Sequence, residues 1–263
     1  MSALHVLSWN LAGRVERQPE QAAVLAAAKW DVVCLQEVTP GTLRPWNDAL
    51  RDLGLTWVVS SMDDWLPGEP PPDDRRLGVL TAGREPLEAI ASAHIPWPER
   101  LLSVRVHGEF VVHNLHSPIS QRANHVKIRT HRALAAYLAR KRELPQLVVG
   151  DFNTPRREKA DGTTWSFARD SRGRLRLDRG APWEEAELAV LRGLEPHGYR
   201  DVFRAIHGYA RDEISWSAGR SRYRLDHVVA SREWELMGCG YLHEPREAGL
   251  SDHSPMWAEL ALR

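Results

Sequence analysis

Residues 147–155, LVVGDFNTP, contain the change in sequence character that decides the fold. The apolar run before Gly150 predicts a buried strand, and the polar residues after it predict the loop by which that strand leaves its sheet. Asp151 and Asn153 are two positions apart, so their side chains point the same way from an extended backbone. The carboxylate can hold a cation or a water, and the carboxamide can donate hydrogen bonds to an anionic oxygen. Alone, this motif is equally consistent with a plain turn at a strand end.

The same arrangement, an apolar segment that ends in a polar residue, recurs elsewhere in the chain. It occurs at residues 4–9 before Asn10, at residues 31–35 before Gln36 and Glu37, and at residues 109–115 before His116. Each of these segments has the length and composition of a strand. The recurrence favours a functional site over a plain turn.

The rest of the chain alternates between helical and extended patterns. Helices are predicted over residues 18–30, 42–53, 122–142 and 184–194, with a short one over 199–206. Further strands are predicted over residues 56–60, 77–81, 222–230 with Asp226 in its middle, and 255–260; residues 101–106 and 109–115 form a hairpin. Residues 61–76 are expected to be an exposed loop, and residues 156–182 a long loop or a small hairpin around Gly173. Hairpin strands interleaved with helices predict an α/β fold in which a pair of mixed sheets is flanked by helices.

Length and composition indicate an ordinary globular protein. The 263 residues contain no recognisable linker, so a single domain over residues 1–263 is expected. The longest apolar run is too short to cross a bilayer, and the N-terminus lacks a secretory signal pattern, which favours the cytoplasm. Cys34 and Cys239 do not form a disulfide framework and are predicted to be buried thiols.

Charge is balanced overall but unevenly distributed. Lys plus Arg and Asp plus Glu both number 35, so the chain lacks the global charge of a strongly basic nucleic-acid binder. Arg156, Arg157 and Lys159 directly follow the Asp151 loop, and more arginines follow up to Arg179. These residues form either a basic rim beside an acidic centre or a solvated loop.

Six short motifs occur in a fixed order between residues 8 and 253. They are Ser8-Trp9-Asn10, Leu35-Gln36-Glu37-Val38, Asn114-Leu115-His116-Ser117-Pro118, Gly150-Asp151-Phe152-Asn153, Arg224-Leu225-Asp226-His227-Val228 and Ser251-Asp252-His253. Each is weak alone, but in this order they closely resemble the endonuclease/exonuclease/phosphatase superfamily, which includes deoxyribonuclease I-like and exonuclease III-like enzymes. The resemblance implies a four-layered αββα sandwich and divalent-metal-dependent hydrolysis of phosphate esters.

The resemblance also implies two groups of site residues. The metal-binding group is Asn10, Glu37 and Asp252, with Glu37 as the main ligand. The catalytic group is His116, Asp151, Asn153, Asp226 and His253. Within it, Asp151 orients the attacking water or binds a second metal, Asn153 and His116 donate to the phosphate, and Asp226 fixes the imidazole of His253. Two neighbours of these motifs, His227 and Trp216, are expected to serve packing instead.

The chemistry of the acidic residues supports a bound cation. Glu37, Asp151 and Asp252 in one pocket would repel each other by roughly 4 kcal/mol per close pair at an effective dielectric near 20. A bound cation removes that cost. Oxygen ligands favour Mg²⁺ or Mn²⁺, and no cysteine–histidine spacing suggests zinc.

The branch of the superfamily decides the expected substrate. Exonuclease III-like abasic endonucleases usually carry tyrosine where this chain has His116, whereas deoxyribonuclease I, sphingomyelinases and tyrosyl-DNA phosphodiesterases carry histidine. No apolar hairpin suits membrane docking. We therefore expect a cytoplasmic nuclease or DNA phosphodiesterase, monomeric and without an obligatory protein partner, in which Trp65 and Trp165 could stack on bases. The alternative is a phosphatase or phosphodiesterase for a small-molecule or lipid-headgroup phosphate ester.

Overall fold

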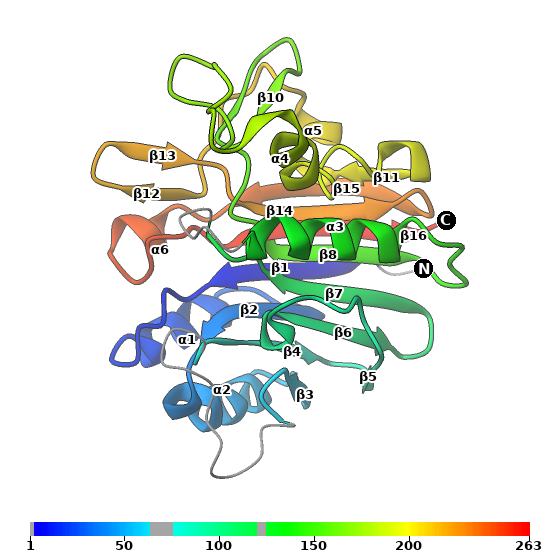
Figure 1. Cartoon of the computed structure of the whole chain (residues 1–263). Helices are drawn as coiled ribbons and strands as arrows, with labels where there is room; N and C mark the ends of the chain where they lie inside the picture. The colour runs from blue at the N-terminus through cyan, green and yellow to red at the C-terminus, as the bar shows by residue number, and fades with distance from the viewer. Residues whose placement is uncertain (1–2, 64–75, 120–124) are drawn as a thin grey trace.

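Two six-stranded sheets form the centre of the computed structural model, which describes residues 3–63, 76–119 and 125–263 (Figure 1). In spatial order the first sheet contains β15 (Trp234–Tyr241), β16 (Met256–Leu262), β1 (Leu4–Asn10), β2 (Val32–Val38), β4 (Gly78–Gly83) and β3 (Trp57–Ser60). The second contains β11 (Tyr199–Asp201), β14 (Asp226–Ser231), β8 (Gln146–Asp151), β7 (Phe110–His116), β6 (Leu101–Val106) and β5 (Leu87–Ala89). The β1–β2 and β7–β8 pairs are parallel and the other pairs antiparallel, so both sheets are mixed.

Helices cover the outer faces of both sheets. The α-helices are α1 (Gln18–Ala26), α2 (Pro40–Asp52), α3 (Val126–Leu138), α4 (Gly180–Glu187), α5 (Val202–His207) and α6 (Glu244–Glu247), and the short 3-10 helices are η2 (Pro98–Arg100) and η3 (Glu195–His197). The side chain of Thr39 accepts a hydrogen bond from the backbone N–H of Thr42 in a capping box, and Pro40 follows at the first helical position, which fixes the start of α2. No helix in the described ranges is long and apolar enough to cross a membrane.

The alternation of side chains along the central strands produces the layers. On β1, Val6 enters the core between the sheets, whereas Leu7 enters the core under α1 and α2. On β8, Val149 faces the same central core, whereas Val148 packs with residues of α3. Strands that are buried on both faces read as continuous apolar runs, as residues 147–149 do. The expected four-layered αββα sandwich is thus confirmed.

Two smaller hairpins and several element boundaries differ from the sequence-based expectations. Residues 156–182 include the hairpin of β9 (Arg157–Glu158) and β10 (Thr164–Trp165), and α4 begins at residue 180 rather than 184. Residues 199–206 divide into β11 and α5, because Asp201 leaves the strand and caps the helix by accepting from the N–H of Arg204. Helix α3 spans fewer residues than 122–142, and residues 64–75, including Trp65, lie outside the described residues.

The expected strand over residues 222–230 is also wrong in detail. Residues 221–223 form β13 (Ser221–Tyr223), which pairs with β12 (Trp216–Ala218), and the sheet strand β14 starts only at Asp226. The intervening Leu225 accepts a hydrogen bond from the N–H of Phe152 through its carbonyl oxygen. Asp226 therefore lies at the start of a strand and not in its middle.

Candidate active site

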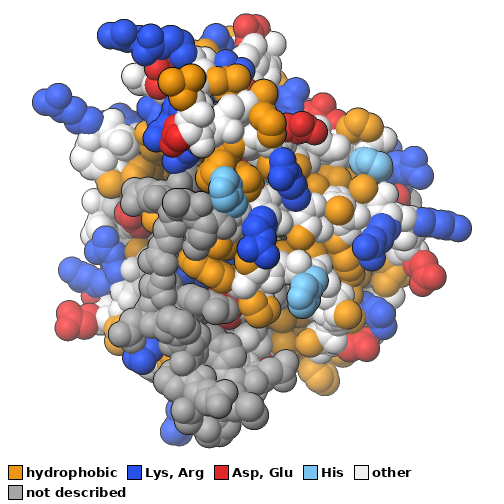
Figure 2. Space-filling model, in the orientation of Figure 1, with side chains coloured by type: hydrophobic (Ala, Val, Ile, Leu, Met, Phe, Trp, Pro, Cys, Tyr) orange, Lys and Arg blue, Asp and Glu red, His pale blue; other side chains and the backbone are white. Residues whose placement is uncertain are grey.

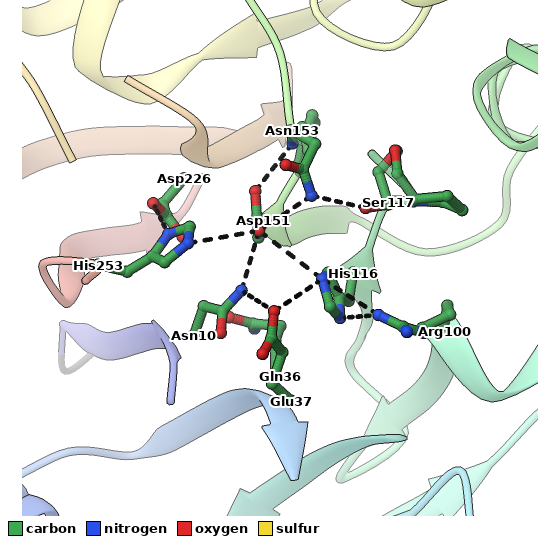
Figure 3. Close-up of polar contacts among 12 residues, drawn as sticks. Asn10, Gln36, Glu37, Arg100, His116, Ser117, Asp151, Asn153, Asp226 and His253 are labelled. Atoms are coloured by element: carbon green, nitrogen blue, oxygen red, sulfur yellow. Dashed lines mark hydrogen bonds and ion pairs between the residues drawn. The ribbon is translucent and has the colours of Figure 1, made fainter. Parts of the chain in front are cut away.

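Strand registers bring the polar side chains of the second sheet together. His116 at the end of β7 pairs with Asp151 at the end of the parallel strand β8. Because β14 runs antiparallel to β8, its first residue, Asp226, lies on the other side of Asp151. The end of β1 reaches this row from the other sheet, since Asn10 Nδ2 donates to Asp151 Oδ2 at 2.9 Å. The site is thus built where the ends of strands from both sheets meet (Figure 3).

Backbone geometry explains two features of the motifs. Gly150 has a φ of +131°, and a Cβ at this position would lie 2.0 Å from the carbonyl oxygen of Leu115 on β7. Only glycine can therefore precede Asp151 while the two strands stay paired. Glu37 has a φ of +57° at a register shift between β2 and β4, and such a bulge turns a side chain away from the regular alternation.

Asp151 is the centre of the hydrogen-bond network. Its Oδ2 accepts from Asn10 and, at 3.1 Å, from Nδ2 of Asn153, while its Oδ1 accepts from the backbone N–H of Asn153 at 2.8 Å. Burial raises the pKa of Asp151 to about 7, although the neighbouring His253 opposes this shift. A carboxyl group with such a pKa can both give and take a proton near neutral pH.

His253 and Asp226 form a buried pair beside Asp151. Nδ1 of His253 lies 2.8 Å from Asp226 Oδ2, which also accepts from the Ser215 hydroxyl at 2.6 Å. Nε2 of His253 lies 3.8 Å from Asp151 Oδ2. Burial lowers the pKa of His253, but the carboxylates of Asp226 and Asp151 outweigh burial and raise it to about 10. The ring is therefore an imidazolium at neutral pH, with one nitrogen held by Asp226 and the other facing Asp151.

His116 is held differently. The guanidinium of Arg100 contacts Nδ1 of the ring, and Nε2 lies 3.3 Å from Oε1 of Glu37. Burial and, next, the charge of Arg100 hold the pKa of His116 well below its usual range, so the ring is neutral. A neutral ring that accepts at Nδ1 carries its hydrogen on Nε2, from which it can donate to Glu37.

A cleft of about 450 Å³ opens above these groups. Its lining includes five of the eight predicted site residues: Glu37, Asp151, Asn153, Asp252 and His253. The other three, Asn10, His116 and Asp226, contact these residues from beneath. The structure therefore brings all eight together.

Of the two residues expected to serve packing, Trp216 lines the cleft and His227 is buried. Trp216 is half-buried and lines the cleft, where its indole N–H donates to Oδ2 of Asp252 at 2.8 Å, so the expectation of a core residue is wrong. Its ring stacks on Tyr223, its cross-strand neighbour, which explains why a large aromatic stays at the surface. His227 is fully buried and its Nε2 lies 2.7 Å from the carbonyl oxygen of Thr154, as expected of a packing residue.

Comparison with known proteins gives the same family as the motifs. A family model described as "Endonuclease/Exonuclease/phosphatase family" matches residues 7–253. The chain belongs to this family. Its members are metal-dependent phosphoesterases, and this chain is an enzyme of that class. No curated protein sequence matches the chain significantly.

Three solved structures illustrate how widely this endonuclease/exonuclease/phosphatase fold is shared. A 3′ phosphatase NExo from Neisseria, bound to product DNA hairpin, has a TM-score of 0.71 at 18% identity, covering 98% of this chain and 99% of that one. An AP endonuclease from Archaeoglobus fulgidus has a TM-score of 0.68 at 20% sequence identity, and the match covers 97% of this chain and 98% of that one. D. rerio TDP2 complexed with single strand DNA product has a TM-score of 0.65 at 17% sequence identity, and the match covers 99% of this chain and 100% of that one. At such identities the likeness establishes the fold.

The donor set of this family member fits a hard divalent cation. Oxygen atoms of Glu37, Asp151 and Asp252 line the cleft, and the side chains of Glu37 and Asp252 are 22% and 36% exposed. Ligand atoms of Asp151, Asp226 and His253 also lie within 4.8 Å of one another. That second group fits less well, because Asp226 is fully buried and its Oδ2 is already held by Ser215 and His253.

Sequence reasoning missed three residues that support the site. Arg100 contacts His116, Ser215 contacts Asp226, and Lys127 on α3 donates to the carbonyl oxygen of Asn153. None belongs to a strand end, so the pattern that identified the other residues gives no signal for them. Only Ser215 was near a recognised position, since it precedes Trp216.

Proposed function

We propose that this enzyme is a divalent-metal-dependent phosphodiesterase that hydrolyses nucleic acid, with DNA as its substrate. The observation that carries the proposal is a row of polar side chains below a carboxylate-lined cleft: Asn10 donates to Asp151, Asp151 lies 3.8 Å from His253, and His253 is hydrogen-bonded to Asp226. A phosphodiester is negatively charged and repels hydroxide. Its hydrolysis therefore needs a cation, an oriented water, and donors for the charge that develops on the phosphorus oxygens.

The proposed cation is Mg²⁺ or Mn²⁺, bound at Glu37 and Asp252 with Asn10 beside them. When bound, such a cation polarises the phosphate and lowers the pKa of a coordinated water. Asn10 donates its amide N–H groups to Glu37 and Asp151, and its Oδ1 accepts from the N–H of Ala12. In this arrangement Asn10 holds both carboxylates in place.

The proposed catalytic roles follow from protonation states and donor directions. Asp151 orients the attacking water or contacts a second cation, and its raised pKa lets it exchange a proton. The imidazolium of His253 stabilises the charge on the phosphate through Nε2, while Asp226 fixes the ring at Nδ1. Asn153 and His116 are the further proposed donors to the phosphate; in this role Asn153 Nδ2 exchanges its present bonds to Ser117 and Asp151, and His116 Nε2 its contact with Glu37, for bonds to the substrate.

The choice of DNA is supported by two kinds of observation. Two of the similar structures hold DNA products. In addition, the basic residues Arg156, Arg157 and Lys159 come directly after the catalytic loop in sequence. We further propose a monomeric cytoplasmic protein without an obligatory partner, in keeping with its two buried free cysteines, Cys34 and Cys239.

A small phosphate ester is the second candidate substrate. The cleft of about 450 Å³ lies within the range of pockets that enclose small ligands, roughly 300–1,000 Å³. A molecule of that size would be bound within the cleft alone and would not need the basic residues beyond it.

A substrate panel tests both candidates. Labelled single-stranded DNA, duplex DNA, RNA and small phosphodiesters are incubated with metal-free enzyme in Mg²⁺, Mn²⁺ or chelator. We expect no turnover in chelator and cleavage of DNA on addition of Mg²⁺ or Mn²⁺. Glu37→Gln should weaken metal binding in calorimetry, whereas Glu109→Gln, which alters an exposed carboxylate elsewhere, should not.

Two results would contradict the proposal. Full turnover in chelator after exhaustive metal removal would exclude the metal mechanism. Rapid hydrolysis of small esters with no cleavage of any nucleic acid would support the second candidate instead.

A further inference from the structure

A second hollow, of about 720 Å³, lies beside the catalytic cleft and shares Tyr223 with it. We call it the basic groove and define it by Arg156, Arg157, Lys159 and Trp165 on one side and Arg222 and Tyr223 on the other. Seven basic and three acidic side chains line it. Figure 2 shows Lys and Arg side chains projecting at the upper left, where Figure 1 draws the loops to the left of β10 and the tip of the β12–β13 hairpin.

Two of the arginines in the groove are neutralised by buried partners. Arg224 donates to Glu158 at 2.7 Å and to Asp201 at 2.6 Å, and Arg204 donates to Glu158 at 2.7 Å. Burial opposes ionisation of Glu158, but Arg224 and Arg204 overcome it and lower the pKa of that carboxyl to about 2. Two arginines thus face two carboxylates, and this buried network contributes no net charge to the groove.

Four of the remaining cations have no such partner. Within the described residues, no carboxylate lies within 4.0 Å of Arg156, Arg157, Lys159 or Arg222. Of the other two acids in the lining, Glu213 already contacts Arg211 and His243, and Asp212 is exposed. The lining of the groove therefore carries a net positive charge, although the exposed Asp161 is near enough to Lys159 for the two opposite charges to interact.

The ring of Trp165 holds two of these cations in position. Nζ of Lys159 lies 4.3 Å from the ring centroid of Trp165, and the guanidinium carbon of Arg157 lies 5.6 Å from it. A Cβ on Gly173 would lie 2.4 Å from the same ring, so backbone also packs against it. Trp165 is therefore half-buried and holds cations, which corrects the expectation that it is an exposed platform for bases.

The groove is continuous with the site of chemistry along a row of rings. Arg156 lies 5.8 Å from the centroid of Phe167, which contacts Tyr223 edge-on at 5.1 Å. Tyr223 stacks on Trp216, whose indole donates to Asp252. Phe167, Tyr223 and Trp216 all line the catalytic cleft. An anionic chain that leaves the cleft past Tyr223 thus meets Arg156 first and then Arg157 and Lys159.

We propose that the basic groove binds the phosphodiester backbone of a nucleic-acid strand on one side of the scissile phosphate, and so selects polymers over small phosphate esters. This inference rests on the proposed function and assigns part of its substrate specificity to Arg157 and Lys159. Unpaired, preorganised cations in a groove suit successive phosphates, whereas the occupied ring of Trp165 offers no base-specific contact.

Binding in chelator tests the groove without any hydrolysis. Fluorescence anisotropy is measured with labelled single strands of 2, 4, 8 and 12 nucleotides, and with a duplex, at several salt concentrations. The variant Arg157→Gln/Lys159→Gln is compared with Lys29→Gln/Arg51→Gln, which removes the same charge from exposed positions near the other sheet. Arg222→Gln, altered at an exposed position on β13, serves as a second test if the double variant fails to fold.

The groove variant should bind the dinucleotide like the wild type and lose the gain in affinity with strand length. Its log–log salt slope for single strands should fall by about 1.4, since each lost phosphate contact removes about 0.7. The control variant should retain the wild-type gain in affinity with strand length and the wild-type salt slope.

Every other outcome is also decisive. If the groove and control variants had equal salt slopes and an equal gain in affinity with strand length, the proposed role of the groove would be wrong. It would also be wrong if the wild type bound no strand at low salt. DNA cleavage in Mg²⁺ would then still leave the proposed function standing. Conversely, groove-dependent binding without hydrolysis of any nucleic acid would support strand binding by the groove and refute the proposed function.

Discussion

Individual residues of this site depend on one another through protonation as well as contact. Asp226 is fully buried, and among the described residues its Oδ1 has no hydrogen-bond partner, so its charge is stabilised chiefly by His253 and Ser215. His253 in turn keeps its proton because Asp226 and Asp151 raise its pKa. A buried ion pair that only stabilises the fold would have the same geometry as a catalytic pair. Catalytic rates separate these two interpretations.

We expect His253→Ala to lower the hydrolysis rate by a factor of roughly 10² to 10⁴, the usual effect of losing a positioned acid–base group. Asp226→Asn should cost as much or less, because it removes only the partner that fixes the ring. The double variant should be little slower than His253→Ala, since residues that act as a unit are not additive. Metal affinity, measured by calorimetry, should be largely kept.

The matched control is His197→Ala at an exposed histidine on η3, which should leave the rate unchanged. Rate losses that multiply in the double variant would mean that His253 and Asp226 act independently, and the paired role would have to be abandoned.

At the scale of elements, the sequence predicted the strands with strong apolar patterns and missed those without one. Residues 147–150 were recognisable because both faces of β8 are buried. β15 was missed because glycines interrupt its pattern: Gly240 leaves room for the ring of Trp257 on β16, which a Cβ would approach to 3.1 Å, and a register shift falls between Leu236 and Gly238. Such glycines indicate a close approach only once the neighbouring strand is known.

The site was predictable for a related reason. Its residues follow strand ends, and registers then place His116, Asp151 and Asp226 in one row. Supporting contacts from helices and loops, such as Arg100 on η2, depend on tertiary packing that periodicity does not encode.

The support of the catalytic loop by α3 and α4 gives a prediction at this scale. Lys127 on α3 and Glu187 on α4 are almost completely buried, and their charged groups lie 2.7 Å apart. Glu187 also accepts from the Trp183 indole and from the N–H of Phe167. Lys127→Met should lower the free energy of unfolding by about 3–5 kcal/mol, because it leaves Glu187 charged and buried without its cation.

Urea denaturation measures this cost, and Lys127→Met/Glu187→Gln should be less destabilised than Lys127→Met because the orphaned charge is gone. Lys141→Met, at an exposed lysine just after α3, is the control and should change stability little. An unchanged denaturation midpoint in Lys127→Met would contradict the prediction.

At the scale of the whole molecule, one core cluster joins the inner faces of both sheets, from Val6 and Val32 on one to Val112 and Val149 on the other. We propose that residues 1–263 form one domain for this reason, since neither sheet could keep its inner face dry alone. Such a core also encloses titratable groups, and these couple its stability to pH.

His113 on β7 is fully buried, and burial lowers its pKa from the ordinary 6.5 to about 4. Below pH 6.5 the unfolded chain therefore binds a proton at this residue that the folded chain does not bind. Stability falls as the pH drops from 6.5 to 4 and is constant below that, with respect to this residue. The expected loss is about 3 kcal/mol at 1.36 kcal/mol per pKa unit.

Denaturant unfolding of the wild type and of His113→Gln across pH 4 to 7.5 tests this coupling. The difference in unfolding free energy between the two proteins should shrink by about 3 kcal/mol as the pH falls, because the glutamine does not titrate. His197→Gln, at an exposed position, should follow the wild type throughout. A difference between His113→Gln and wild type that stays constant with pH would mean that His113 is protonated as easily in the folded protein as in the unfolded chain.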